Sequence, residues 1–279
     1  MKFDLVILGA GSGGYEAALY AHRRGMRVAL VELSPQSVGG NCLNKGCIPS
    51  KHMRHGAYLL EKFQKMYSYG IVPKGFEMDI KGLKSGREEI ITSIREGFKK
   101  FAQQVGIPIF YGRGVLKDKN TVYVEGEDKK ITADFILLAT GSSTTRVGQL
   151  SPDNRRIYDT DQIWDIDAFP KRLLIVGGGA VGVEFAYIFR MYGSQVVLVE
   201  LKDRLLPSDY IPEESSRYLA RKLKKLGVDV RLRTTVENVQ EKEGELKVTL
   251  SDGSQVDVDI ILLLSLIHIS EPTRLGMIS

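Results

Sequence analysis

The feature that most constrains this chain is a supersecondary unit that occurs twice. Each copy has a short apolar run, a glycine-rich turn, a stretch with helical periodicity and a second apolar run that ends in glutamate. The first copy covers residues 3–32 and the second covers residues 173–200. A strand, a crossover helix and a parallel strand within about thirty residues form the β-α-β unit of α/β proteins. The repeat therefore predicts an α/β fold with two Rossmann-like, three-layer domains.

The turn of the first copy is a glycine motif, Gly9-Ala-Gly11-Ser-Gly-Gly14. Gly9 permits the tight turn, Gly11 lets the backbone approach a pyrophosphate, and Gly14 lets the helix pack closely on the strand. The amides that begin the helix then face the phosphate charge. Glu32 follows at the end of the second strand, where its carboxylate can accept hydrogen bonds from a ribose. These residues predict a dinucleotide site.

The second copy has the same pattern in Gly177-Gly-Gly179-Ala-Val-Gly182, and its acidic residue is Glu200. A carboxylate at this position repels the 2′-phosphate of NADP and accepts hydrogen bonds from the ribose of NAD. Lys202 lies nearby and weakens this distinction. The second motif therefore favours NAD.

Two cysteines, Cys42 and Cys47, lie five positions apart within residues 39–51, GGNCLNKGCIPSK, where a helix is expected to begin. A helix N-terminus lowers the pKa of a thiol, and two such thiols can form an exchangeable disulfide beside a redox partner. A zinc site with His52 and His55 has the right number of ligands, but the spacing is not that of the usual zinc fingers. The pattern favours redox chemistry and no metal.

Outside the two units, the periodicity predicts a helix at 53–67 and a longer helix at 83–105. The polar stretch at 141–170 is expected to be an irregular link between the two domains. Short strands are expected at 109–111, 115–116, 121–124 and 135–139.

The composition is that of a globular protein, with 43% hydrophobic and 26% charged residues. The net charge of +5 comes from 39 basic residues scattered among 34 acidic ones, a pattern of solvated faces and not of a nucleic-acid surface. No apolar run approaches the roughly 20 residues that span a bilayer. Asp4 interrupts the first apolar run, which argues against a signal peptide and favours a cytoplasmic location.

The last sixteen residues, 264–279, differ in character from the rest of the chain. The stretch at 264–274, LSLIHISEPTR, resembles a translated sequencing-library adapter, and the residues after it match the adapter's continuation. We therefore exclude this tail from fold reasoning and expect the genuine sequence to break off near Leu263.

The cysteine segment is close to GGTCLNxGCIPSK, a motif of the pyridine nucleotide-disulfide oxidoreductases, with Asn41 in place of the usual Thr. The chain resembles this flavin-dependent family in two further ways: it has two dinucleotide motifs, and Ala-Thr-Gly at 139–141 matches the exit from the family's FAD domain. Leu43 and Ile48 resemble the dihydrolipoamide dehydrogenases more than the glutathione or mercuric reductases.

The resemblance covers residues 1–263 in order and implies an FAD-binding domain at 1–145 and an NAD-binding domain at 146–263. FAD would be held by Gly9, Gly11, Gly14, Glu32, Gly40, Asn41, Lys51, Ala139, Thr140 and Gly141. NAD would be held by Gly177, Gly179, Gly182 and Glu200.

The resemblance also implies a mechanism. Cys42 would exchange with the dithiol substrate, and Cys47 would lie against the flavin. Lys51 would lie near the flavin edge and pair with Glu184, across the two domains. Electrons would pass from dihydrolipoamide to the disulfide, and then through FAD to NAD as hydride.

In the family, the chain continues into a central domain and a dimerisation domain, and the latter supplies a His–Glu pair as general base. These domains are missing from this sequence, so we expect weak FAD retention, no dimer and negligible activity from this chain. The full-length parent is expected to be a homodimer that acts on a lipoyl-bearing acyltransferase or H-protein. Two alternatives remain: a mercuric reductase or other disulfide reductase of the family, and a non-catalytic dinucleotide-binding module.

Overall fold

The computed structural model describes residues 1–72, 74–142, 150–242 and 244–264. These residues form two compact units. The first unit contains residues 1–49 and 85–142, and the second contains residues 50–84 and 150–264.

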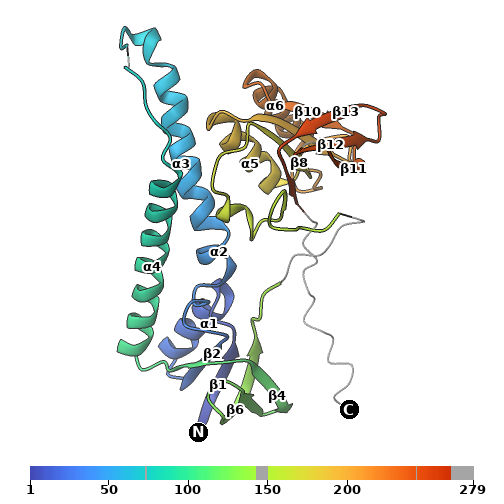
Figure 1. The fold of residues 1–279 in the computed structure, drawn as a ribbon. Coiled ribbons are helices and arrows are strands. Elements are labelled where there is room, and N and C mark those ends of the chain that lie inside the picture. The colour runs from blue at the N-terminus through green and yellow to red at the C-terminus, as the bar shows by residue number, and fades with distance from the viewer. Residues whose placement is uncertain (73, 143–149, 243, 265–279) are drawn as a thin grey trace. The chain divides into compact units, whose positions relative to one another are not determined.

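The first unit is built on a six-stranded sheet of order β3-β2-β1-β6-β5-β4 (Figure 1). The strands β3, β2, β1 and β6 run parallel, and β4, β5 and β6 form an antiparallel meander. The elements are β1 (Lys2–Leu8), α1 (Ser12–Arg23), β2 (Val28–Glu32), α2 (Gly40–Asn44), α4 (Ile80–Gln104), β3 (Ile109–Tyr111), β4 (Gly114–Asp118), β5 (Thr121–Val124) and β6 (Lys129–Leu138). The first residues of α3 and most of α4 belong to this unit.

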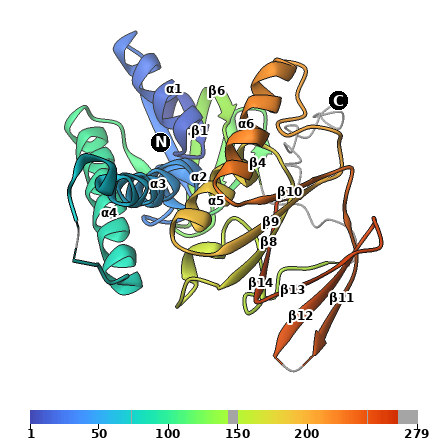
Figure 2. The same cartoon turned by 90° about the horizontal axis from the view of Figure 1, so that it is seen from above.

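The second unit has a parallel five-stranded sheet of order β10-β9-β8-β14-β7 and an antiparallel three-stranded sheet of order β11-β12-β13 (Figure 2). Its helices are α3 (Cys47–Gln64), α5 (Ala180–Met191) and α6 (Glu213–Lys225), with 3-10 turns at Met66–Tyr69 and Ile163–Asp165. Its strands are β7 (Ile157–Tyr158), β8 (Arg172–Val176), β9 (Gln195–Glu200), β10 (Asp229–Leu232), β11 (Val236–Lys242), β12 (Glu245–Leu250), β13 (Gln255–Val258) and β14 (Ile260–Leu263).

The predicted repeat is confirmed at the level of topology. The order β3-β2-β1-β6 in the first sheet corresponds to β10-β9-β8-β14 in the second. In the first unit β4 and β5 precede β6 and form the antiparallel meander with it, whereas in the second unit the separate three-stranded sheet β11-β12-β13 precedes β14. A glycine-rich turn and a helix follow the central strand in both copies. The two sheets therefore form two Rossmann-like α/β folds, as the sequence predicts.

The structure corrects the interpretation of 141–170 as an irregular link. Residues 143–149 lie outside the described residues, but β7 adds an edge strand to the second sheet, with Ile157 opposite Ile261. Trp164 is only 7% exposed and packs in the core of the second unit. A two-residue strand and a single 3-10 turn are too short to show a periodicity, so the sequence pattern could not reveal them.

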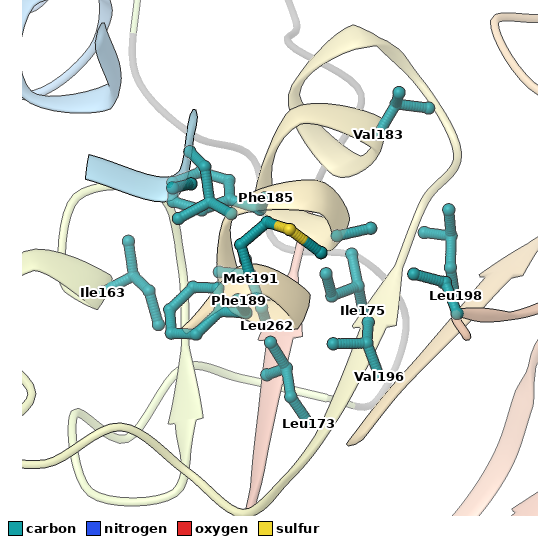
Figure 3. Close-up of a cluster of buried hydrophobic side chains, with 14 of the residues drawn as sticks. Ile163, Leu173, Ile175, Val183, Phe185, Phe189, Met191, Val196, Leu198 and Leu262 are labelled. Atoms are coloured by element: carbon teal, nitrogen blue, oxygen red, sulfur yellow. The ribbon is translucent and has the colours of Figure 1, made fainter. Parts of the chain in front are cut away.

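The core of the second unit lies between α5 and the strands β8, β9 and β14. Figure 3 shows Phe185 and Phe189 of α5 on the side of the helix toward Ile163, with Leu173, Ile175 and Val196 of β8 and β9 in the same cluster. Because most residues of α5 are apolar, most of this helix is buried in the core.

The first unit has a core on each face of its sheet. Ile7 and Leu30 face the side covered by α1, where Tyr15 packs against them. Val6 and Val31, one residue along each strand, belong to the cluster on the opposite face. This alternation is the two-residue period of a β-strand.

Residues 265–279, which make up nearly all of the predicted adapter-derived tail, lie outside the described residues. Within the part of the chain that is described, no helix is both long and apolar enough to cross a membrane.

Candidate dinucleotide and disulfide sites

The glycines of the first motif are required by contacts within the backbone. Gly9 has φ of +106°, and a Cβ built there lies 2.2 Å from the carbonyl oxygen of Ala139. A Cβ on Gly14 lies 1.8 Å from the carbonyl oxygen of Gly9. Neither position tolerates a side chain, because in both cases the obstacle is backbone. These glycines bring the start of α1 directly against the ends of β1 and β6.

The Glu32 carboxylate is buried and is held by two backbone amides, one of which belongs to the glycine turn. Its Oε2 accepts a hydrogen bond of 2.7 Å from the Ala10 amide, and its Oε1 accepts one of 2.8 Å from the Leu33 amide. A carboxylate oxygen has two lone pairs, so each oxygen retains the capacity for one further donor. Glu32 therefore locks the glycine turn and can still accept a hydrogen bond from a ribose hydroxyl.

The second motif repeats this arrangement almost atom for atom. Gly177 has φ of +118°, and a Cβ on Gly182 lies 1.9 Å from the carbonyl oxygen of Gly177. The Oε2 of Glu200 accepts a hydrogen bond of 2.6 Å from the Gly178 amide, and its Oε1 accepts one of 2.8 Å from the Lys202 amide. The backbone of Lys202 thus holds the carboxylate that the sequence pattern places near a ribose.

The two helix starts fit a pyrophosphate. Gly11 is the N-cap of α1 and Gly179 is the N-cap of α5; neither helix has a side-chain cap or an acidic residue in its first turn. Cβ atoms on Gly13 and Gly179 meet nothing within 4 Å, so the backbone there is open. Amides at the start of a helix attract phosphate oxygens, and a bound dinucleotide fits both turns.

The two cysteines form a disulfide in the structure, Cys42–Cys47, with their Cα atoms 4.6 Å apart. Cys42 lies within the short helix α2 and is half-buried, whereas Cys47 is the first residue of α3 and is exposed. The expectation that this pair lies where a helix begins is confirmed.

The loop that carries Cys42 is packed onto the first glycine motif. The Gly39 amide donates a hydrogen bond of 2.9 Å to the Ala10 carbonyl, and a Cβ on Gly40 lies 2.7 Å from the Cα of Gly11. The disulfide and the turn predicted to bind FAD are therefore neighbours within one unit. Paired glycines allow this close approach, because any side chain at Gly40 would meet backbone.

Three further residues predicted for the FAD site, Ala139, Thr140 and Gly141, directly follow β6. The Ala139 amide donates a hydrogen bond of 2.8 Å to the Leu8 carbonyl, so this exit lies beside β1. Asn41 is exposed, and its Nδ2 donates a hydrogen bond of 3.4 Å to the Ser142 carbonyl. Thr140 and Gly141 are also exposed. Asn41 therefore lies beside the residues that follow β6, which were predicted for the same FAD site.

Lys51 and Glu184 form the ion pair that the resemblance implies, with Nζ and Oε1 2.5 Å apart. Both residues belong to the second unit, with Lys51 on α3 and Glu184 on α5, so the pair lies within one unit and not across the two domains as expected. The side chains are 56% and 25% exposed, so the pair contributes only about 0–1 kcal/mol to stability.

The same face of the second unit has a cavity of about 900 Å³ whose lining includes Lys51, Glu184 and Tyr187. The Tyr187 hydroxyl donates a hydrogen bond of 2.9 Å to Glu61. Burial of Tyr187 and this hydrogen bond raise the pKa of its hydroxyl to about 12. A hydrogen bond from Lys65, opposed in part by burial, holds the pKa of Glu61 below its usual value. The hydroxyl of Tyr187 is thus protonated at neutral pH.

Within the described part of the chain, no group of three or more His, Cys, Asp or Glu side chains is arranged to hold a metal ion.

The described residues thus combine two nucleotide-binding folds with a disulfide packed on the first glycine turn, and the comparisons with known proteins place this combination in a family. The sequence profile of the pyridine nucleotide-disulphide oxidoreductases matches residues 3–264, so the chain belongs to that family.

Among curated relatives, a dihydrolipoyl dehydrogenase from Chlamydia pneumoniae is 31% identical over 263 residues, which cover 94% of this chain and 56% of the relative. One from Acholeplasma laidlawii is 32% identical over 272 residues, covering 94% of this chain and 77% of the relative. Among solved structures, the HOCl-induced flavoprotein disulfide reductase RclA from Escherichia coli is 27% identical with a TM-score of 0.78, covering 95% of this chain and 56% of that one. The chain thus spans little more than half the length of several relatives.

Sequence reasoning missed two residues of the site. Asn44 donates hydrogen bonds to the carbonyls of the loop before Cys42, and Arg95 of α4 donates to Asn44. Asn44 lies in the cysteine motif and could have been singled out there. No pattern in the sequence connects Arg95, 51 positions further along, with this loop.

Proposed function

We propose that the protein to which this sequence belongs oxidises a small or protein-bound dithiol of the dihydrolipoyl type and passes the electrons to NAD. The observation that carries this proposal is the Cys42–Cys47 disulfide packed on a glycine turn that fits a dinucleotide. The dihydrolipoyl dehydrogenases among the relatives support the choice of substrate class.

In this proposal, the first glycine motif and Glu32 hold FAD. The amides that begin α1 bind the pyrophosphate, and the Glu32 carboxylate accepts from the ribose. Gly40, Asn41 and the 139–141 segment lie beside that turn and complete this part of the site. When bound, FAD supplies the electron carrier between the disulfide and the nicotinamide.

The cysteine pair exchanges with the dithiol. A thiolate of the substrate attacks one sulfur, which we assign to Cys42, and the S–S bond to Cys47 breaks. The second substrate thiol displaces Cys42, so the substrate leaves as a disulfide and both cysteines are reduced. The two electrons and two protons lost by the substrate are gained by the cysteine pair.

The second glycine motif and Glu200 hold NAD in the same way. The buried carboxylate of Glu200 disfavours the 2′-phosphate of NADP. The Lys51–Glu184 pair is proposed to belong to the catalytic machinery. The physiological partner in this scheme is a lipoyl-bearing acyltransferase or an H-protein, and the whole protein is a homodimer.

The test compares the full-length protein with its Cys42→Ser and Cys47→Ser variants under anaerobic conditions, because this chain alone is expected to have negligible activity. Dihydrolipoamide should reduce protein-bound flavin in the unaltered full-length protein and at least about 100-fold more slowly in either variant, since both thiols are needed for the exchange. NADH should reduce the flavin in all three proteins, because that transfer does not use the cysteines. Equal rates with dihydrolipoamide in the three proteins would exclude the proposal.

A second candidate is a disulfide reductase with another substrate, which the likeness to the HOCl-induced flavoprotein disulfide reductase favours. The same assay separates the two. Flavin reduction by NADH without any cysteine-dependent reduction by dihydrolipoamide would favour this second candidate.

A further inference from the structure

The loop that leads to the redox disulfide contains two successive glycines in left-handed conformations. Gly39 has φ of +94° and Gly40 has φ of +63°, and together they turn the chain into α2. Glycine restricts the backbone less than any other residue, so the two glycines do not stiffen this turn themselves. The position of Cys42, two residues further on, therefore depends on what holds the carbonyls of this loop.

Asn44 holds them. Its Nδ2 lies 2.9 Å from the Gly40 carbonyl oxygen, 3.2 Å from that of Val38 and 3.3 Å from that of Ser37. An amide nitrogen has only two hydrogens, so these bonds are shared among the three acceptors. One side chain thus gathers the loop just before the first cysteine.

Arg95 fixes the orientation of Asn44. The guanidinium donates from Nε at 3.2 Å and from Nη2 at 2.8 Å to the Asn44 Oδ1. Because a guanidinium only donates, the atom that faces it must be the amide oxygen, and the amide nitrogen must face the carbonyls. The Arg95 side chain is only 13% exposed, so its charge is held in place at a cost in hydration.

We propose that Arg95 is a positioning residue for the Cys42–Cys47 disulfide and acts through Asn44. Arg95, Asn44, the glycine loop and both cysteines all belong to the first unit. The inference rests on the proposed function, because it assigns a role toward the same disulfide. By holding the loop, Arg95 keeps the two sulfur atoms within bonding reach and thereby favours the disulfide over the dithiol.

The test is the disulfide–dithiol equilibrium of the 279-residue chain in dithiothreitol buffers, read by trapping and counting free thiols. One dithiothreitol becomes a cyclic disulfide for each Cys42–Cys47 bond that is reduced, so electrons and protons balance. Arg95→Met should move the equilibrium about tenfold toward the dithiol, which is about 30 mV for a two-electron couple. Arg95→Lys retains one donor and should move it about threefold.

Lys100→Met is the matched control, since Lys100 is an exposed cation on the same helix. Its equilibrium should stay within about twofold of the unaltered chain, as expected for an exposed side chain. Asn44→Asp keeps the acceptor for Arg95 but loses the donor to the carbonyls, and should shift the equilibrium in the same direction as Arg95→Met. Combining Arg95→Met with Asn44→Asp should add little, because the two residues act in series.

Two results overturn the inference. One is an equilibrium within twofold of the unaltered chain in Arg95→Met, even if its melting temperature falls, since that pattern marks a merely structural role. The other is full additivity of the two substitutions. If Arg95→Met does not fold, Arg95→Lys and Asn44→Asp are judged by the same criteria. Because thiol trapping uses neither nucleotide nor dihydrolipoamide, failure here leaves the proposed dithiol oxidation standing, and the converse also holds.

Discussion

At the residue scale, neighbouring glycines of the first motif have opposite requirements. Gly14 is buried, and its Cα faces the carbonyl of Gly9 so closely that no side chain fits. Gly13 is exposed in the first turn of α1, and a Cβ there meets nothing within 4 Å. The motif therefore combines a glycine needed for packing with one that leaves the backbone open to a ligand.

We predict that Gly14→Ala destabilises the protein by about 2–4 kcal/mol, because a methyl group 1.8 Å from backbone forces α1 away from β1. Gly13→Ala is the matched control and should be neutral or stabilising by about 0.5–1 kcal/mol, since alanine loses less entropy in a helix. Urea unfolding without added nucleotide measures both. Equal stability of the two variants would contradict the steric argument.

At the element scale, an ion cluster joins the start of β8 to the segment between β13 and β14. Asp259 accepts hydrogen bonds from the Arg172 amide at 2.9 Å and from its Nη2 at 2.7 Å. Burial alone pushes the pKa of Asp259 up, but the hydrogen bonds from Arg172 outweigh it, and the pKa lies below its usual value. These bonds fix the register in which β14 enters the sheet beside β8.

We predict that Asp259→Asn lowers the free energy of unfolding at pH 7 by about 1–2 kcal/mol, through loss of charge-assisted hydrogen bonds. Because the folded pKa is depressed, this contribution is present above the unfolded value of 3.8 and is lost as the pH falls through the folded value. The difference between variant and unaltered chain should therefore shrink below about pH 3.8. Thermal unfolding measured from pH 7 to pH 2.5 provides the comparison.

Asp209→Asn is the control for that series, because Asp209 is exposed and the substitution is chemically the same. It should change stability by less than about 0.5 kcal/mol at every pH. A deficit in Asp259→Asn that stays constant down to the lowest pH would show that the carboxylate charge is not the cause.

At the scale of the whole molecule, each unit has its own hydrophobic cores. The single tryptophan, Trp164, belongs to the core of the second unit and packs 5.4 Å from Phe185, measured between ring centroids. Phe189 is fully buried in that same core. Tryptophan fluorescence therefore reports the unfolding of the second unit.

We predict that Phe189→Ala lowers the stability of the second unit by about 3–5 kcal/mol, as removal of a buried aromatic ring does. Phe135→Ala is the matched control: the same truncation, at a ring that is 66% exposed in the first unit. It should leave the tryptophan-monitored transition within about 0.5 kcal/mol of the unaltered chain. Chemical denaturation followed by fluorescence distinguishes them, and similar losses in both variants would contradict separate cores.

The sequence by itself determined the two β-α-β units, the glycine motifs with Glu32 and Glu200, and the place of the cysteine pair. These features depend on local requirements, such as positive φ at Gly9 and alternation along a strand, which residue types reveal directly. The edge strand β7 and the 3-10 turn that buries Trp164 could not be predicted in this way, because both are too short to show a periodicity.

Only the tertiary structure decided which distant side chains support the site. The bonds from Arg95 to Asn44 join positions that no local pattern connects. The motifs place Glu32 and Glu200 near their glycine turns, but only the structure shows which amides hold them. The physical reason is that a hydrogen bond between elements depends on how the chain packs, and packing brings together residues that are far apart in sequence.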